Sequence, residues 1–154
     1  MIADHAPDDR RLQPWLHDLV VALAAPTQAW CGPDGQVRAS GAQGFYHGDV
    51  RVLSRAVLTL DEVEPVSVLV SPDGATAVLA VGVARLLGDT GPDPTVRVQR
   101  RRVVAPGRVD EVIVLESSAR AALATRVRLA LEVDLAPIDR VKSGEPVAPV
   151  PPTP

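Results

Sequence analysis

Hydrophobic and polar residues alternate along several short stretches of the chain. The clearest case is "RVRLALEVD", residues 126–134, where the apolar positions are Val127, Leu129, Leu131 and Val133. A period of two residues is typical of a strand that buries one face and exposes the other. We therefore predict a half-buried strand here. A second strand is predicted in "RAVLTL", residues 55–60, with Ala56, Leu58 and Leu60 on one face.

Four further runs are rich in valine and are bounded by turn residues. They are "VSVLVS" at 66–71, "ATAVLAVGV" at 75–83, "TVRVQ" at 95–99 and "VDEVIVLE" at 109–116. The tripeptide "PDG" occurs twice, at 33–35 and 72–74, and Asp-Gly supplies the positive φ angles that tight turns need. Many short strands separated by turns predict an all-β fold, an antiparallel β-sandwich.

One segment fits two kinds of element. In "PWLHDLVVALA", residues 14–24, the apolar positions Leu16, Leu19, Val20 and Leu23 have the i, i+3, i+4, i+7 spacing of a helix. The β-branched pair Val20–Val21 and the following "APT" favour a strand instead. The pattern alone leaves both readings open.

The two ends of the chain differ from its middle. Residues 1–13 are polar without periodicity, and we expect a loose leader there. Residues 145–154 are rich in proline and predict a disordered linker or tail. Residues 14–144 then form the β-sandwich domain, and 154 residues suit a single domain.

Composition and charge narrow the possible partners. A net charge of −3 and 3% aromatic residues argue against a nucleic-acid partner, which a basic face and stacking side chains would indicate. No apolar run reaches the roughly 20 residues that span a bilayer, and the N-terminus lacks a signal-peptide pattern. The single cysteine, Cys31, cannot form an internal disulfide. We expect a cytoplasmic protein without a membrane partner.

Few chemistries fit the residues. The three histidines, His5, His17 and His47, have no second ligand at zinc spacing, and we expect neither metal nor cofactor. No phosphate loop and no nucleophile elbow occur. We interpret Cys31 as a half-buried apolar residue at a strand end and not as a nucleophile. In "VQRRRVV", residues 98–104, Arg100 and Arg102 interrupt the valines, so we expect a bulge or strand end with solvated arginines.

The stretch "GFYHGDVRVLSR", residues 44–55, permits two interpretations. In the first, a polar loop presents Tyr46, His47 and Asp49 to a ligand or partner. In the second, glycines shape a corner that an ion pair between Asp49 and an arginine holds, while Phe45 fills the core. Residue chemistry favours the second interpretation.

Residues 34–69, which contain that stretch, resemble the opening of the N-terminal domain of bacterial glycogen debranching enzymes of the amylo-α-1,6-glucosidase type. The positions that carry the resemblance are Asp34-Gly35, Gly44, Phe45, Asp49, Arg51, Leu53-Ser54 and Pro65. A later family segment is matched in part by "DLAPIDRVKSG", residues 134–144, at Asp134, Ala136, Ile138, Val141 and Lys142. Pro137, Asp139 and Arg140 depart from it. The resemblance covers residues 16–144.

The resemblance implies a β-sandwich that precedes a helical (α/α) barrel, and it favours a strand at 14–24. In such enzymes the catalytic carboxylates belong to the barrel. The resemblance therefore implies a chain without catalytic residues of its own, which supports a glycoside hydrolase domain. Family domains run some tens of residues longer, so we expect an incomplete sandwich.

The implied partners are the chain's own barrel domain or a separate subunit, and an α-glucan. The candidate interface or cleft residues are Tyr46, His47, Asp49, Arg51 and Asp134. We expect Asp49 and Arg51 to order a loop at the edge of the glucan cleft. The alternative function is a free-standing carbohydrate-binding or protein-interaction module. Only Trp15, Trp30, Phe45 and Tyr46 could form a sugar platform, which argues against carbohydrate binding.

Overall fold

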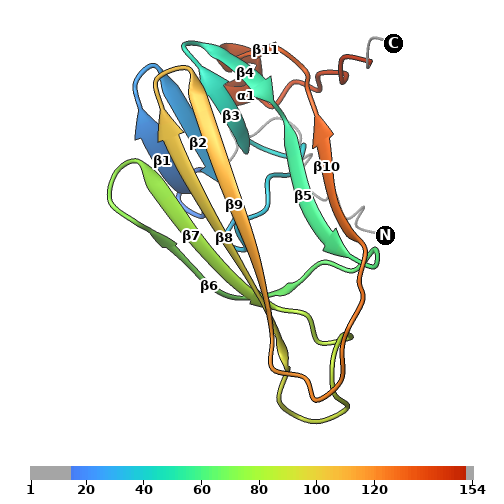
Figure 1. The fold of residues 1–154 in the computed structure, drawn as a ribbon. Helices are drawn as coiled ribbons and strands as arrows, with labels where there is room; N and C mark the ends of the chain where they lie inside the picture. The colour runs from blue at the N-terminus through green and yellow to red at the C-terminus, as the bar shows by residue number, and fades with distance from the viewer. Residues whose placement is uncertain (1–14, 152–154) are drawn as a thin grey trace, which may run out of the picture.

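The fold consists of two antiparallel β layers packed face to face (Figure 1). The structure, a computed structural model, describes residues 15–151. The predicted leader at 1–13 and residues 152–154 of the predicted tail lie outside this range. About half of the chain is strand and the sheets are antiparallel, so the prediction of an all-β, sandwich-like fold is confirmed.

The first layer contains a sheet with the strand order β1-β2-β3-β4-β11. Its strands are β1 (Val20–Ala24), β2 (Thr27–Cys31), β3 (Gly44–His47), β4 (Val50–Leu53) and β11 (Ala136–Pro137). After Ser54 the chain of β4 continues as β5 (Arg55–Leu60), which pairs with β10 (Val127–Glu132). Because β11 follows β10 and pairs with β4, two long antiparallel segments run through this layer.

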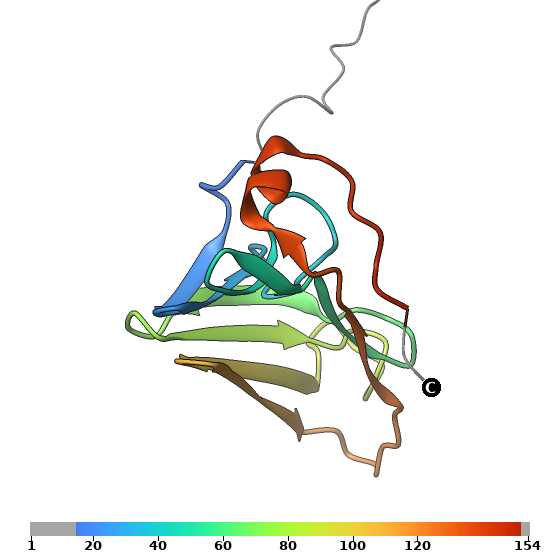
Figure 2. The same ribbon diagram turned by 90° about the horizontal axis from the view of Figure 1, so that it is seen from above.

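The second layer is a four-stranded sheet in the order β6-β7-β8-β9 (Figure 2). Its strands are β6 (Val66–Pro72), β7 (Ala77–Val83), β8 (Val96–Ala105) and β9 (Arg108–Ser117). Each of the four valine-rich runs therefore forms or begins a strand. The helix α1 (Ile138–Ser143) follows β11 and ends at Gly144, which has the left-handed conformation of a helix C-cap.

The ambiguous segment at 14–24 forms the strand β1 and not a helix, as the family resemblance implies. Residues 17 and 18 lie in a turn, and the strand begins at Val20. The β-branched pair Val20–Val21 pairs with Cys31 and Trp30 of β2. Pairing across the sheet outweighs a helical spacing that only a few residues share.

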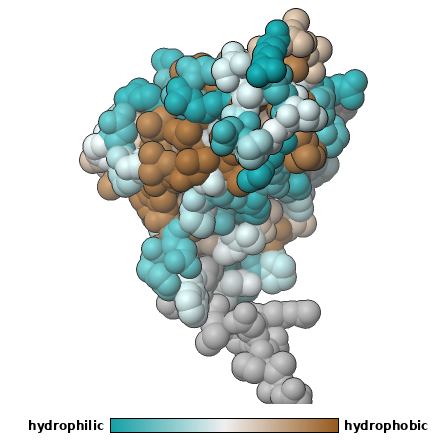
Figure 3. Space-filling view, turned by 90° about the horizontal axis from the view of Figure 1, so that it is seen from below, coloured by the Kyte–Doolittle hydropathy of each residue, from teal (hydrophilic) through white to brown (hydrophobic). Residues whose placement is uncertain are grey.

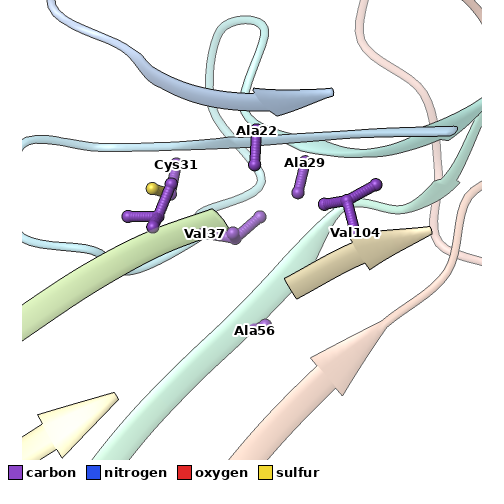
Figure 4. Packing of buried hydrophobic residues seen from close by; sticks show 7 residues of the cluster. Ala22, Ala29, Cys31, Val37, Ala56 and Val104 are labelled. Atoms are coloured by element: carbon purple, nitrogen blue, oxygen red, sulfur yellow. The ribbon is translucent and has the colours of Figure 1, made fainter. Parts of the chain in front are cut away.

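Small aliphatic side chains fill the space between the two layers (Figure 4). The buried cluster consists of Ala22, Ala29, Cys31, Val37, Ala56, Val78 and Val104. Cys31 ends β2 as predicted, but it is fully buried and not half-buried, because the other layer covers it. A second buried cluster packs β5 onto the other layer through Leu58, Leu60, Ala84, Val96 and Val98. Ala56, Leu58 and Leu60 thus face inward as the alternation predicts.

A third cluster lies on the opposite face of the first layer. Phe45 and Tyr46 are neighbours in β3, and their side chains point to opposite faces. Phe45 packs partly buried against the core between the layers, and Tyr46 is fully buried with Ala42, Ala136 and Val141. Since Val141 belongs to α1, the helix covers this face.

The strand predicted at 126–134 forms as β10, but its predicted half-burial is wrong. Val127, Leu129 and Leu131 are 46%, 38% and 57% exposed. β10 lies at the edge of its layer, beyond β5 (Figures 1 and 2). The other layer covers β5 but leaves the apolar side chains of β10 in solvent. Alternation therefore identified the strand, and its position at the edge decided the burial.

The expectation of a bulge or end at Arg100 and Arg102 is also wrong. β8 runs without interruption from Val96 to Ala105 and pairs in regular register with both β7 and β9. The two arginines occupy inward positions between Val98 and Val104 and are only 6% and 3% exposed. They keep the alternation because Glu111 on β9 neutralises part of their charge inside the sandwich.

The part of the proline-rich segment that the structure describes contains no helix or strand. It nevertheless contacts the domain. Val147 packs against the cluster around Tyr46, and the Val150 N–H donates to the Val133 carbonyl over 2.6 Å. The segment thus passes the end of β10. Apolar side chains also gather on the underside of the molecule (Figure 3), and along β6 Val66, Val68 and Leu69 are exposed.

Candidate functional site around Arg51 and Asp134

Arg51 and Asp134 form a buried ion pair, which we call the Arg51–Asp134 clamp. Each residue is 7% exposed. The Arg51 Nη2 donates to Asp134 Oδ2 over 2.5 Å, and Nε donates to the same oxygen over 3.1 Å. Two donors on one planar guanidinium fix the orientation of the carboxylate as well as its charge. The two segments that carry the family resemblance, residues 34–69 and 134–144, therefore meet at this clamp.

The chain around Asp134 places its carboxylate against β4. Leu135 has a φ of 51°, a left-handed conformation that turns the chain after Asp134. The Asp134 Oδ1 accepts a hydrogen bond from the Ala136 N–H over 3.3 Å, and Ala136 pairs with Arg51 in the sheet. The turn, the short strand β11 and the ion pair therefore support one another.

Arg51 also holds the corner that leads into β3. Its Nη1 donates to the carbonyl oxygens of Gly41 and Gln43 over 3.3 and 3.2 Å. Gly44 has a φ of 153°, and a Cβ there would lie 2.5 Å from the Arg51 Cδ. Only glycine fits both the backbone conformation and the space at this position. The predicted glycine corner thus exists, with Arg51 as its support.

The acid that pairs with the arginine differs from the predicted one. Asp49 lies exposed between β3 and β4, and among the described residues it forms no ion pair. Its backbone carbonyl accepts from the Ile138 N–H over 2.8 Å. The partner of Arg51 is Asp134, separated from it by 83 residues. Local sequence pattern favoured Asp49 because it cannot show which distant strand lies alongside β4.

Tyr46 and His47 have different surroundings. Tyr46 is fully buried, and its hydroxyl donates to the Ala42 carbonyl over 2.7 Å. Burial raises the pKa of Tyr46 above its ordinary value, although the nearby charge of Arg51 opposes that rise. His47 is exposed, and its Nδ1 lies 3.1 Å from the Thr27 Oγ. Tyr46 is therefore a packing residue, whereas His47 and Asp49 are exposed at the hairpin.

The clamp lines a cavity of about 200 Å³. Ser54, Val141 and Glu145 are among the other lining residues, and Pro146, Val147 and Pro149 form part of its wall. The proline-rich segment thus covers the side of the clamp that faces away from the sheet core.

Sequence reasoning missed a second buried ionic group, formed by Arg100, Arg102, Glu111 and Gln36. The Arg100 Nε donates to Glu111 Oε1 over 2.5 Å, and the Arg102 Nη2 donates to Glu111 Oε2 over 3.1 Å. Arg100 also hydrogen-bonds the Gln36 side chain, and Arg102 lies 5.0 Å from the Phe45 ring centre. The sequence did hold a signal for this group. Arg100 and Arg102 lie in the same phase of the alternation as Val98 and Val104, which predicts one continuous strand with both arginines facing inward.

The electrostatics of Glu111 show what this group can do. Burial raises the pKa of Glu111, but the charges of Arg102 and Arg100 outweigh burial and hold the pKa below its ordinary value. A carboxyl with a lowered pKa stays ionised near neutral pH, whereas the general acid of a glycosidase must keep its proton. Glu111 is thus suited to an ion pair and not to acid catalysis.

Residues 15–151 hold no group of three or more His, Cys, Asp or Glu side chains arranged to bind a metal ion. The helix in this part of the chain is too short to span a bilayer.

Comparison with known protein families gives a match to most of the chain. A model of the family described as the N-terminal domain of (some) glycogen debranching enzymes matches residues 23–151. The matched range contains both members of the clamp and the hairpin between β3 and β4. No curated protein and no solved structure matches the chain.

Proposed function

The chain belongs to the family of N-terminal domains of some glycogen debranching enzymes, and we propose that it acts there as a non-catalytic β-sandwich domain. In this proposal it supports a helical-barrel glycoside hydrolase domain, on the same chain or on a separate subunit, in the cytoplasm. The family match over 23–151 is the observation that carries the proposal.

The state of the buried carboxylates supports a non-catalytic role. Asp134 is held by Arg51, and Glu111 is held by Arg100 and Arg102. Glycoside hydrolysis needs one carboxyl that can give up a proton and a second that is free to act as nucleophile or base. Carboxylates held by buried guanidinium groups meet neither requirement.

We place the contact with the barrel, and through it the edge of the α-glucan cleft, at the hairpin between β3 and β4. His47, Asp49, Val50 and Val52 are all exposed there. Beside the hairpin an open cleft of about 410 Å³ is lined by Phe45, Leu53 and Val109, among others. Mixed apolar and polar surface of this kind is typical of contacts between domains. In this proposal Arg51 and Asp134 position the hairpin from behind, without touching the partner.

A free-standing module is the alternative function, and the structure favours protein interaction over sugar binding in that case. Tyr46 is fully buried, and Trp30 and Phe45 are partly buried, so these three rings offer little flat surface to a sugar. Trp15 is 69% exposed, but it is a single ring that lies outside the strands. The exposed apolar edge of β10 offers a surface to another protein instead.

The first experiment is to measure the mass of the native polypeptide in its own cells, with an antibody raised against this domain. A product several times larger than 16.3 kDa supports a domain that precedes a barrel on the same chain. A product of about that size, with no debranching activity in the material that the antibody precipitates, would overturn the proposal and leave the free-standing module.

The second experiment tests the hairpin in the native debranching enzyme. We expect His47→Ala with Asp49→Ala to lower the debranching rate about tenfold, equivalent to roughly 1.4 kcal/mol at the contact. The melting temperature should fall only slightly, through loss of the hydrogen bond between His47 and Thr27. The matched control is Asp93→Ala, an exposed acid in the loop between β7 and β8, at the far end of the molecule in Figure 1. Equal rates for the double variant and the control would remove the hairpin from the contact.

A further inference from the structure

The outer edge of β10 presents unpaired backbone groups. In an antiparallel sheet the N–H and C=O of one residue point to the same side, and the side alternates along the strand. On β5, Ala56 and Leu60 bond through their backbones to Val37 and Val63. The backbone groups of Leu58 bond to the Gln36 side chain. These three residues therefore point away from β10.

Their cross-strand partners consequently point away from β5. Ala56, Leu58 and Leu60 lie opposite Leu131, Leu129 and Val127. The N–H and C=O groups of these three β10 residues are thus directed at the outer edge. Among the strands that the structure describes, none pairs with that edge. Further along, the Val133 carbonyl already accepts from the Val150 N–H.

Exposed apolar side chains on β10 add a hydrophobic surface to this edge. Val127, Leu129 and Leu131 expose 46%, 38% and 57% of their surface on the face that continues the core side of β5. An edge strand with free backbone groups and exposed apolar side chains is a template for pairing with another strand. No proline lies within β10 to prevent it.

We propose that β10 pairs antiparallel with β10 of a second copy of this chain, in the register centred on Ala130. The outward backbone groups belong to odd-numbered residues, so odd must pair with odd, and the centre lies on Leu129, Ala130 or Leu131. Centring on Ala130 places Leu129 opposite Leu131 of the second copy. It places Arg128 opposite Glu132 of the second copy, twice by symmetry.

Within β10 itself, only this register places opposite charges across from each other. Centring on Leu129 sets Arg128 opposite Ala130 and sets Glu132 opposite Arg126, which lies before the strand. Centring on Leu131 sets Glu132 opposite Ala130 and sets Arg128 opposite Asp134, which is buried and held by Arg51. Within one chain Arg128 pairs with Glu62, about 60% exposed, and Glu132 pairs with Arg55, whose side chains are 32% and 42% exposed. The proposed register joins these pairs into a row of alternating charges that runs from Glu62, in the turn after β5, through Arg128 to Glu132 and Arg55 of the second copy. Opposite charges directly across two strands favour pairing, and like charges oppose it.

The test is the self-association of the purified chain, measured by sedimentation over a range of concentrations. We expect a reversible dimer of twice the 16.3 kDa chain mass. Arg128→Glu or Glu132→Arg alone places like charges opposite each other, and each should weaken the dimer at least about tenfold. The double variant restores opposite charges and should return the dissociation constant to within about threefold of the original.

Arg101→Glu is the matched control, because Arg101 is an exposed arginine of β8 with one acidic partner, Asp73. It should leave the dimer unchanged. Circular dichroism of every variant establishes that each one is folded. A chain that stays monomeric at high concentration would overturn the proposal, and so would a double variant that associates no better than the single variants. Neither result affects the proposed role beside a barrel, which the mass of the native product tests separately.

Discussion

At the residue scale, Arg51 joins its own strand β4 to two other segments, the turn after β10 and the loop before β3. Its guanidinium contacts Asp134 after β10 and the carbonyl groups of Gly41 and Gln43 before β3. Both members of the clamp are buried, so neither charge could be compensated by water if the other were removed. Removal of either member would therefore leave an unpaired charge inside the folded chain.

We expect Arg51→Ala to lower the free energy of unfolding by about 3–5 kcal/mol, because it leaves the Asp134 carboxylate buried without a partner. Urea unfolding followed by circular dichroism measures the loss. The control is Arg97→Ala, whose pair with Glu116 is about half exposed and should cost at most about 1 kcal/mol. Similar losses for the two variants would contradict the structural role of the clamp.

The lowered pKa of Glu111 leads to a prediction of how the free energy of unfolding depends on pH. Because Arg102 and Arg100 lower its pKa in the folded chain, the ionised form stabilises the fold above the pKa of the unfolded chain, about 4.3. This contribution is lost as pH falls through the lower pKa of the folded state. In Glu111→Gln we expect lower stability at pH 7 and a shallower decline in acid.

Urea unfolding at a series of pH values between neutrality and strong acid measures that decline. Glu116→Gln removes an exposed carboxylate from the same strand and should follow the unmodified chain. Parallel curves for Glu111→Gln and the unmodified chain would show that Glu111 has the same pKa in the folded and unfolded states.

At the element scale, the hairpin between β3 and β4 depends on two glycines with different demands. Gly44 has a φ of 153° and a Cβ there would lie 2.8 Å from the Leu53 carbonyl oxygen as well as against Arg51. Gly48 has a φ of 57°, and nothing lies within 4 Å of a Cβ placed there. Gly44 is therefore required by conformation and by space, and Gly48 by conformation alone.

We expect Gly48→Ala to cost about 1 kcal/mol, the strain of a left-handed residue. Gly44→Ala should cost at least about 2 kcal/mol more, since overpacking is added to strain and Arg51 must move. Thermal unfolding of the two variants compares them directly. Equal costs would mean that the corner relaxes freely, and that Arg51 does not fix it.

Sequence pattern was most reliable for the existence of elements and least reliable for their neighbours. The alternation in β5 and β10 is equally clear, yet Leu58 is fully buried while Leu129, directly opposite, is 38% exposed. Position in the sheet decides this difference, and no local pattern contains it. For the arginines of β8 the error was the opposite one: they were predicted to be solvated and are buried. Their neutralising partner Glu111 lies on another strand, which the local pattern does not show.

At the scale of the whole molecule, the resemblance gave more than local pattern did. It identified the family, and it favoured a strand in the segment 14–24, where β1 forms; the β-sandwich was predicted from the alternation as well. It also named Arg51 and Asp134 as separate positions without linking them. Their contact depends on β11 lying beside β4, a long-range pairing that only the folded chain displays. The exposed hairpin and β10 edge follow from the same topology.

The sandwich is closed over β5 and open beside β10, and this asymmetry can be measured. Leu58→Ala removes a fully buried side chain and should cost about 2–5 kcal/mol. Leu131→Ala removes a side chain that is 57% exposed and should cost less than about 1 kcal/mol in the isolated chain. Urea unfolding at protein concentrations too low for self-association gives both values.

If Leu131→Ala proves as costly as Leu58→Ala in dilute solution, the open side must be closed within a single chain. If the cost of Leu131→Ala grows with protein concentration while that of Leu58→Ala does not, the side chain is being buried between copies. The concentration dependence of one leucine thus separates a property of the fold from a property of the assembly.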